Sequence, residues 1–179
     1  MQLRPVTAAA LLCVSFATAQ SQQPKHALDV PYVPTDNAVV QGMLKLAGLK
    51  STDTLYDLGC GDGRIVVIAA RDYKARGVGV DIDPQRIQEA KANAERNGVA
   101  TLVRFQEGDL FDADIHNATV VTLYLLPNVN LRLRPKLLAE LKPGTRIVSH
   151  SFDMGDWKPD KQEQVEGAWI YLWTVPAKK

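Results

Sequence analysis

The stretch LYDLGCGDGRIVVIAA, residues 55–70, decides the fold class of this chain. An apolar segment runs into a turn that has glycine at positions 59, 61 and 63, and an amphipathic segment follows the turn. Glycine-rich turns between a strand and a helix are typical of α/β folds in which the backbone approaches a bound ligand. Because Asp57 and Asp62 belong to the same turn, that ligand has to tolerate negative charge close by.

Strands and helices are predicted to alternate along the rest of the chain. The predicted strands span residues 54–58, 77–82, 101–106, 119–125 and 145–151. The predicted helices span residues 36–48, 64–72, 84–97 and 128–141. Pro135 is expected to interrupt the last helix, and residues 163–166 and 169–175 bracket Gly167 as a predicted terminal hairpin. The alternation indicates an α/β fold with a parallel sheet and helices on both faces.

The composition is that of a globular protein without strong charge. The 179 residues suffice for one α/β domain, 46% of them are hydrophobic, 23% are charged, and the formal net charge is +1. A nucleic-acid binder would usually show a basic excess or stripe, so no nucleic-acid partner is expected. We also expect no metal site, because the paired histidine or cysteine spacings that bind metals are missing from the sequence.

The first residues have the organisation of a secretory signal peptide. Arg4 precedes an uncharged apolar stretch at residues 6–17, and Ala17-Thr18-Ala19 matches a cleavage site. The apolar stretch is shorter than the roughly 20 residues that span a bilayer, so no stable membrane insertion is expected. We therefore expect a signal peptide at residues 1–19, a linker at 20–29 and one domain at 30–176. The protein would then be secreted or periplasmic, or cytoplasmic if the leader is not functional.

The charges around the glycine turn distinguish two classes of nucleotide ligand. A dinucleotide fingerprint requires a third glycine at position 64, where this chain has Arg64, and a pyrophosphate would face Asp57 and Asp62. A cationic ligand fits better, since carboxylates at the strand ends attract positive groups. S-adenosylmethionine carries a sulfonium and an α-ammonium and no phosphate. Asp81, after the second strand, is placed to accept both ribose hydroxyls, and Asp109, after the third, to bond the adenine edge.

Five segments together resemble the class I S-adenosylmethionine-dependent methyltransferases. They are DLGCGDGRI (57–65), GVGVDID (77–83), EGDLF (107–111), ATVVTLYLLP (118–127) and LKPGTRIVS (141–149). The resemblance implies a Rossmann-like seven-stranded sheet of order 3-2-1-4-5-7-6 with a final antiparallel strand. It also implies that the cofactor contacts come from Asp57, Gly59, Gly61, Asp81, Asp109 and Leu110.

A narrower likeness points to a group of protein-modifying enzymes. VPYVPT (30–35), TLYLLPNVN (122–130) and SHSFDMGDW (149–157) are similar to the compact archaeal broad-specificity protein-lysine methyltransferases and their mitochondrial relatives. The likeness implies that the segment before the first helix folds over the cofactor, with contacts from Tyr32, Val33, Pro34 and Thr35. It also implies a protein substrate with an accessible lysine, and that Tyr124 and Leu125 lie beside the transferable methyl group, Tyr124 positioning the acceptor.

An aliphatic amine needs an apolar, aromatic channel in which it can lose its proton. The candidates for this channel are Tyr32, Leu125, Phe152 and Trp157, together with Tyr124. His150 is either a general base or a buried structural histidine. Two other functions stay open: a methyltransferase for a small nitrogen, oxygen or sulfur acceptor, and an exported protein that binds nucleosides without catalysis.

Overall fold

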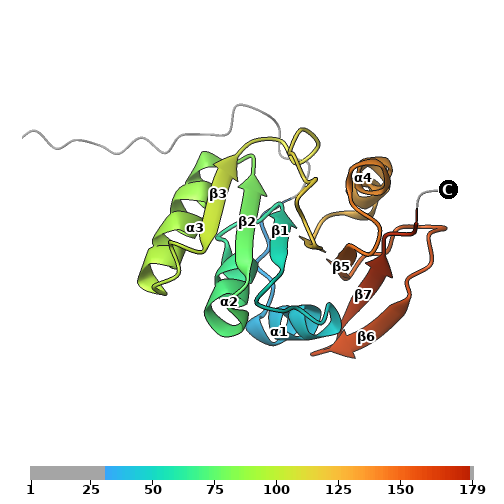
Figure 1. Ribbon diagram of the computed structural model, residues 1–179, viewed down its shortest axis with the longest axis horizontal. Coiled ribbons are helices and arrows are strands. Elements are labelled where there is room, and N and C mark those ends of the chain that lie inside the picture. The colour runs from blue at the N-terminus through green and yellow to red at the C-terminus, as the bar shows by residue number, and fades with distance from the viewer. Residues whose placement is uncertain (1–30, 178–179) are drawn as a thin grey trace, which may run out of the picture.

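The computed structural model describes residues 31–177, and the predicted signal peptide and linker therefore lie outside the described residues. The helices are α1 (Asn37–Leu46), α2 (Arg64–Tyr73), α3 (Pro84–Arg96) and α4 (Pro127–Glu140). The strands are β1 (Thr54–Leu58), β2 (Arg76–Asp81), β3 (Val103–Glu107), β4 (Val120–Leu123), β5 (Arg146–His150), β6 (Lys161–Val165) and β7 (Ala168–Thr174). Strands and helices alternate up to β5, as the sequence predicts, except that β4 follows β3 without a helix between them. The predicted terminal hairpin is the β6–β7 pair (Figure 1).

The strands form one seven-stranded sheet of order β3-β2-β1-β4-β5-β7-β6. Strands β1 to β5 pair in parallel, and β7 runs antiparallel to both β5 and β6. This confirms the predicted order and the predicted antiparallel last strand. Because β1 pairs with β2 on one side and β4 on the other, the connections leave the sheet in opposite directions there. Ligands bind at the carboxyl ends of strands at such a switch point.

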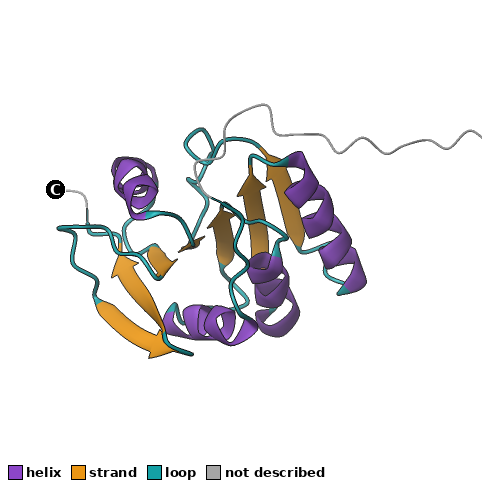
Figure 2. Ribbon diagram, turned by 180° about the vertical axis from the view of Figure 1, so that it is seen from behind, coloured by secondary structure: helices purple, strands orange, loops and turns teal. Residues whose placement is uncertain are grey.

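Helices cover both faces of the sheet, as expected (Figures 1 and 2). Helices α1, α2 and α3 pack on one face, with Val40, Leu44 and Val66 among their buried side chains. Helix α4 packs on the other face through Leu133 and Leu137. Each face thus has its own apolar core, and the sheet between them is held rigid where the ligand site is built.

The two ends of α1 and the beginning of α3 show why the helices begin and end where they do. Asp36 and Asp83 are extended residues whose carboxylates accept the backbone N–H groups of Ala38 and Gln85, which is the usual N-cap. Pro84 follows Asp83 at the first helical position, where its missing N–H is not needed. The chain leaves α1 through Gly48, whose φ is +59°.

The prediction that Pro135 interrupts the last helix is wrong, because α4 continues through it. Proline removes the hydrogen bond that its N–H would donate to the carbonyl of Leu131. Leu131 and Pro135 are both exposed, so this side of α4 faces solvent, where water can replace a missing donor. Among the described residues, no helix is long and apolar enough to cross a membrane.

Candidate active site

The glycine turn holds the backbone against the neighbouring strand and leaves room for a close approach. Gly59 and Gly61 have φ angles of +83° and +52°, which favour glycine. The N–H groups of Gly59 and Cys60 both donate to the carbonyl of Val80, at 2.8 and 2.9 Å. A Cβ at Gly61 would lie 2.5 Å from the ring of Tyr32. The glycine turn predicted to contact a ligand therefore also packs against an aromatic ring.

Asp57 is a buried carboxylate at the base of the turn. It lies on β1, is 2% exposed, and accepts a hydrogen bond from the hydroxyl of Thr122 at 2.8 Å. Burial raises its pKa to about 7; the Thr122 hydrogen bond opposes this rise, and the charges of Asp81 and Asp62 add to it. A cation bound beside such a buried acid would stabilise its ionised form.

Asp81 lies at the end of β2 and is fixed by two backbone donors. One carboxylate oxygen accepts from Gly61 N at 2.7 Å, and the other accepts from Asp83 N at 2.9 Å. Burial raises the pKa of Asp81, and these two hydrogen bonds oppose the rise. Each oxygen keeps a second lone pair, so the side chain can still accept a ligand hydroxyl.

Asp109 follows β3, in the loop beside Asp81. Its carboxylate accepts from Phe111 N at 2.8 Å, which sets the turn after the strand. The preceding Gly108 N donates to the carbonyl of Asp81 at 2.9 Å. The ends of β2 and β3 are therefore tied together, and the two predicted acids line the same cavity.

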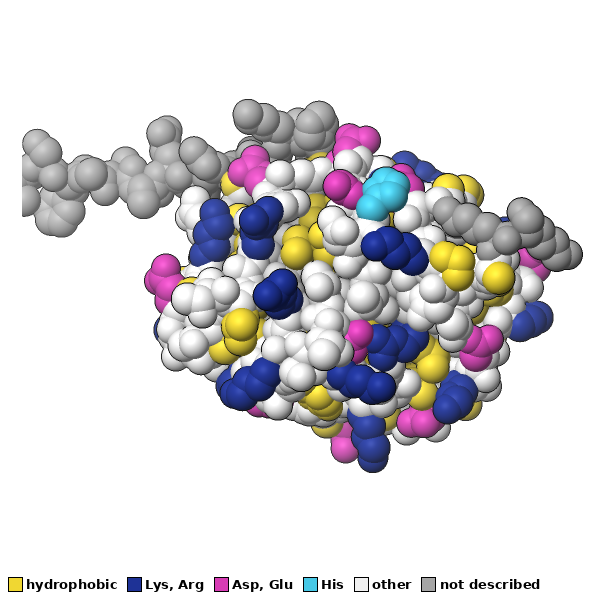
Figure 3. All heavy atoms as spheres, in the orientation of Figure 1, with side chains coloured by type: hydrophobic (Ala, Val, Ile, Leu, Met, Phe, Trp, Pro, Cys, Tyr) yellow, Lys and Arg dark blue, Asp and Glu magenta, His cyan; other side chains and the backbone are white. Residues whose placement is uncertain are grey.

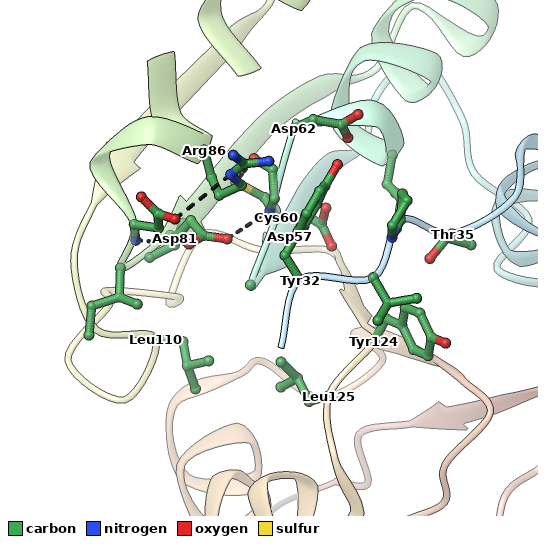
Figure 4. Close-up of a pocket in the computed structure, with 18 of the residues that line it drawn as sticks. Tyr32, Thr35, Asp57, Cys60, Asp62, Asp81, Arg86, Leu110, Tyr124 and Leu125 are labelled. Carbon is green, nitrogen blue, oxygen red and sulfur yellow. Dashed lines mark hydrogen bonds and ion pairs between the residues drawn. The ribbon is translucent and has the colours of Figure 1, made fainter. Parts of the chain in front are cut away.

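The extended segment 31–36, which we call the strap, crosses the glycine turn. Arg64 donates to the carbonyl of Thr35 at 2.8 Å while its other nitrogens bind both oxygens of Asp62. The guanidinium of Arg86 lies over the ring of Tyr32, 4.5 Å from its centroid. The strap is thus held from two helices, and Figure 4 shows Tyr32 extending over the cavity toward Asp62.

A single cavity brings these groups together at the carboxyl edge of the sheet. Its lining residues are Pro31, Tyr32, Val33, Pro34, Thr35, Asp57, Gly59, Cys60, Gly61, Asp62, Arg64, Ile65, Val80, Asp81, Ile82, Asp83, Arg86, Gly108, Asp109, Leu110, Tyr124 and Leu125. All the residues predicted for the cofactor are in this lining. Leu110 and Leu125 border the same open space from two different loops (Figure 4).

Tyr124 lies at one end of the cavity and packs on His150. The two ring centroids are 3.8 Å apart, and His150 Nδ1 lies 3.3 Å from the hydroxyl of Thr35. His150 is 6% exposed, and burial lowers its pKa, so the imidazole is neutral near neutral pH. The histidine therefore connects the strap to the segment after β4 and is not among the residues lining the cavity.

Two of the predicted channel residues lie outside the cavity lining. Phe152 stacks on Tyr124 with centroids 6.5 Å apart, which places it next to the cavity without lining it. Trp157 packs on Trp173 at 6.1 Å, and its carbonyl accepts the Trp173 indole N–H at 2.8 Å. Trp157 is partly buried and packs against the apolar core beneath α4, and its role in a substrate channel stays a prediction.

Sequence reasoning misses Arg64 and Arg86 as cavity residues. In the sequence, Arg64 appears only as the residue that breaks the dinucleotide pattern. Its place directly after the glycine turn, as the first residue of α2, is the feature that could have indicated a cavity residue. Arg86 lies 54 positions after Tyr32, and nothing in the local pattern links the two. Cys60 is also missed as a cavity residue; burial and the nearby Asp57 and Asp81 raise the pKa of its thiol, so it stays neutral.

The comparisons with known proteins agree with this geometry. Residues 57–161 match the family model of the ANTKMT methyltransferase domain, which covers more than half of the chain. The chain belongs to this family. It is an S-adenosylmethionine-dependent methyltransferase, with the class I fold that the resemblance implied.

The methyltransferase is similar to proteins of known description along most of its length. It is 49% identical to a protein-lysine N-methyltransferase of Saccharolobus islandicus, over 82% of this chain and 94% of that one. It is 32% identical to the adenine nucleotide translocase lysine N-methyltransferase of Mus musculus, over 80% of this chain but 63% of that longer protein. A crystal structure described as an RNA methyltransferase from Salinibacter ruber, in complex with S-adenosylhomocysteine, has a TM-score of 0.81 and 58% identity, over 82% and 96% of the two chains.

The residues of the cavity suit S-adenosylmethionine. The buried acid Asp57 offers a negative charge to a cation, and Asp81 keeps acceptor capacity for hydroxyls. Arg64 and Arg86 line the cavity, but each is paired with carboxylates, Arg64 with Asp62 and Arg86 with Asp83 and Glu89. The methyltransferase thus presents its methyl donor with a buried acid at the base of the site and with paired charges at its rim.

Proposed function

We propose that this methyltransferase modifies lysine side chains of protein substrates. The observation that supports it most is the 49% identity to a protein-lysine N-methyltransferase across 94% of that protein's length. The motif after β4, Tyr124-Leu125-Leu126-Pro127, adds to it, because it lacks the Asn or Asp that typically binds a planar amino group in methyltransferases acting on bases. The acceptor that best suits an apolar motif of this kind is an aliphatic amine.

The charge of the site entrance supports a basic substrate. The segments directly after the five parallel strands are 59–63, 82–83, 108–112, 124–126 and 151–157, and together they contain no lysine or arginine. They contain the aspartates Asp62, Asp83, Asp109, Asp112, Asp153 and Asp156. Three of these aspartates are paired with arginines, Asp62 with Arg64, Asp83 with Arg86 and Asp156 with Arg134. The remaining carboxylates would attract a lysine-rich protein segment and raise the energy of an approaching phosphate backbone. On the face in Figure 3, Lys and Arg side chains are interspersed with other types and do not form one stripe.

Each side of the site has a distinct task in this reaction. S-adenosylmethionine supplies the methyl group, which leaves sulfur as the acceptor nitrogen forms the new C–N bond and gives up a proton. Asp57, Asp81 and Asp109 are proposed to hold this cofactor, with Tyr32 and Thr35 covering it. Tyr124 and Leu125 are proposed to border the acceptor, where their apolar surfaces lower the pKa of a lysine amine and favour its neutral, nucleophilic form.

The acceptor class can be tested by labelling a cell extract. The pure enzyme is incubated with methyl-labelled S-adenosylmethionine and an extract of its own organism, and the products are divided between protease and ribonuclease treatments. We expect the label to be removed by protease, to resist ribonuclease, and to elute as methylated lysine after acid hydrolysis. Label that only ribonuclease removes would contradict the proposal and would favour an RNA acceptor, as in the description of the Salinibacter ruber protein.

We further propose that residues 1–19 act as a signal peptide, so that the mature chain starts at Gln20 outside the cytosol. The support is the basic start, apolar stretch and Ala17-Thr18-Ala19 site of the sequence. Cell fractionation followed by N-terminal sequencing tests this directly. A cytosolic protein that retains Met1 would overturn the proposal; a mature chain at Gln20 would mean that the methyl donor has to reach the same compartment.

A further inference from the structure

Asn130, in the first turn of α4, has a fully buried side-chain amide whose nitrogen is hydrogen-bonded and whose oxygen, among the described residues, is not. Its Nδ2 lies 3.3 Å from the carbonyl oxygens of Phe152 and Asp153 and donates to both. The same nitrogen lies 3.2 Å from the hydroxyl of Ser149. Its Oδ1 is buried without a hydrogen-bond partner among the described residues. Nδ2 therefore directs its donors to Ser149 near the end of β5 and to the first residues of the loop that follows the strand.

The unpaired oxygen shows which group fixes the orientation of Asn130. Turning the amide by 180° would place Oδ1 against two carbonyl oxygens, so the observed orientation is the one that the carbonyls of Phe152 and Asp153 require. Native proteins rarely keep a buried acceptor without a partner, because its lost hydration is not regained. The unpaired Oδ1 is thus an energetic cost of the orientation in which Nδ2 holds the loop.

The loop at residues 151–157 leaves β5 by a sharp turn. Ser151 has a φ of +64°, a conformation that residues with a Cβ seldom adopt, and Phe152 N donates back to the carbonyl of His150 at 2.8 Å. The turn brings the ring of Phe152 to 6.5 Å from Tyr124, with the two planes 19° apart. The first half of the loop thereby sets the position of a ring that packs on the cavity wall.

The second half of the loop has its own anchors. Arg134, one turn after Asn130, donates to the carbonyl of Met154 at 2.8 Å and pairs with Asp156. Met154 is fully buried, and Trp157 is fixed by its hydrogen bond and ring contact with Trp173, as described above. These anchors of the second half do not involve the amide of Asn130, and the hydrogen bond from Gly155 N to Asp153 Oδ1 at 3.0 Å joins the two halves.

We propose that Asn130 is a positioning residue for the methyl acceptor, acting through Phe152 and Tyr124. Its amide holds residues 151–153 so that the Phe152 ring packs on Tyr124 at the acceptor end of the cavity. Asn130 and Phe152 both lie outside the cavity lining, and the lining residue that Phe152 contacts is Tyr124, the residue proposed to border the acceptor. The inference rests on the proposed function only for the chemical nature of that acceptor.

The experiment compares Asn130→Ala and Asn130→Asp with Arg134→Met, which loosens the second half of the same loop. We expect the Asn130 variants to lose about 10- to 100-fold in kcat/KM for the acceptor, because small misplacements of reacting groups have effects of that size. The KM for the acceptor accounts for part of the loss. Cofactor Kd by calorimetry should stay within about twofold, and Arg134→Met should lose less than about threefold in kcat/KM.

Phe152→Ala keeps the proposal testable if an Asn130 variant fails to fold. It should reproduce the loss in acceptor kcat/KM, and the double variant Asn130→Ala/Phe152→Ala should lose no more than Phe152→Ala alone. Hydrogen exchange at residues 151–153 should be faster in Asn130→Ala and unchanged in β7. An Asn130 variant with full acceptor kinetics, or with cofactor affinity reduced in proportion to turnover, would overturn the proposal. Wild-type enzyme that labels RNA alone would overturn the lysine function, and the same variants would then be measured on RNA.

Discussion

The ring of Tyr32 rests on the bare backbone of Gly61, so that a single added carbon at Gly61 would lie 2.5 Å from Tyr32 Cε2. The two residues lie on segments that meet only in the folded protein, the strap and the glycine turn. The contact explains why Gly61 has no side chain more fully than its φ of +52° does. It also means that the turn can be altered with a known structural consequence.

Gly61→Ala should weaken cofactor binding about tenfold or more, because the new Cβ displaces either Tyr32 or the backbone N–H that Gly61 donates to Asp81. The matched control is Gly48→Ala, which has a similar φ of +59° and nothing within 4 Å of the added carbon. Both variants carry about 1–2 kcal/mol of left-handed backbone strain. Calorimetry should show reduced affinity only for Gly61→Ala; equal affinities in the two variants would disprove the contact's importance.

Arg64→Leu should speed cofactor release, since it removes the hydrogen bond from α2 to the Thr35 carbonyl of the strap. We expect stopped-flow to show a cofactor dissociation rate about five- to tenfold higher. The reason is that loss of a hydrogen bond from a charged group costs roughly 1.5 kcal/mol, and slightly less where water replaces the lost donor. The melting temperature should change little. Arg71→Leu is the control on the same helix, because Arg71 also pairs with a neighbouring aspartate, Asp72, and makes no bond to the strap. An unchanged dissociation rate in Arg64→Leu would show that the strap is held by other contacts.

Trp157→Ala should destabilise the fold by about 2–3 kcal/mol, because Trp157 packs on Trp173 beneath α4. The expected loss is below the range of about 3–5 kcal/mol for a fully buried large aromatic side chain, since Trp157 is partly buried. Trp169→Ala, at a position that is 43% exposed, should cost much less. Urea unfolding gives both values, and cofactor affinity should be unchanged in each folded variant. If Trp157→Ala were fully stable and lost acceptor turnover alone, the result would contradict a structural role and would support the channel prediction for Trp157.

The sequence predicts those features that depend on local pattern. Thr54–Leu58 is both the predicted and the observed β1, because an apolar run that ends at a glycine turn has few alternatives. The order of strands follows from the family likeness, whose motifs lie at the strand ends. The prediction at Pro135 is wrong, because which side of α4 faces solvent depends on tertiary structure, and Pro135 and Leu131 are both on the exposed side.

The features that the sequence does not predict are contacts between distant segments. Arg86 over Tyr32 and Asn130 beside Phe152 join residues that share no pattern, and each pairing is defined only by how the helices pack on the sheet. Trp157 is of a residue type that suits a substrate channel, yet its position is set by ring packing on Trp173 of β7. The sequence thus predicts which types of side chain a site contains more easily than it predicts which distant residues pack against them.

The raised pKa of Asp57 links conformational stability to pH. Its folded value of about 7 lies above its ordinary value of 3.8, so the protonated form favours folding. That stabilisation is complete below about pH 4 and is lost as the pH rises through 7. Between about pH 5 and pH 7.5 the ligand-free protein should lose on the order of 2–3 kcal/mol, and Asp57→Asn should lose less. Urea unfolding at the two pH values measures the difference; a wild-type slope equal to that of Asp57→Asn would contradict it.

The most direct measurement of the central claim, that the buried carboxylate of Asp57 receives a positively charged nucleoside, is calorimetric titration of S-adenosylmethionine at about pH 6 and pH 7.5. The cofactor should select the ionised acid, so affinity should rise roughly tenfold over this interval with a proton released at the lower pH, and Asp57→Asn should bind weakly with no such rise. Equal wild-type affinity at the two pH values, or an unweakened Asp57→Asn, would contradict the account.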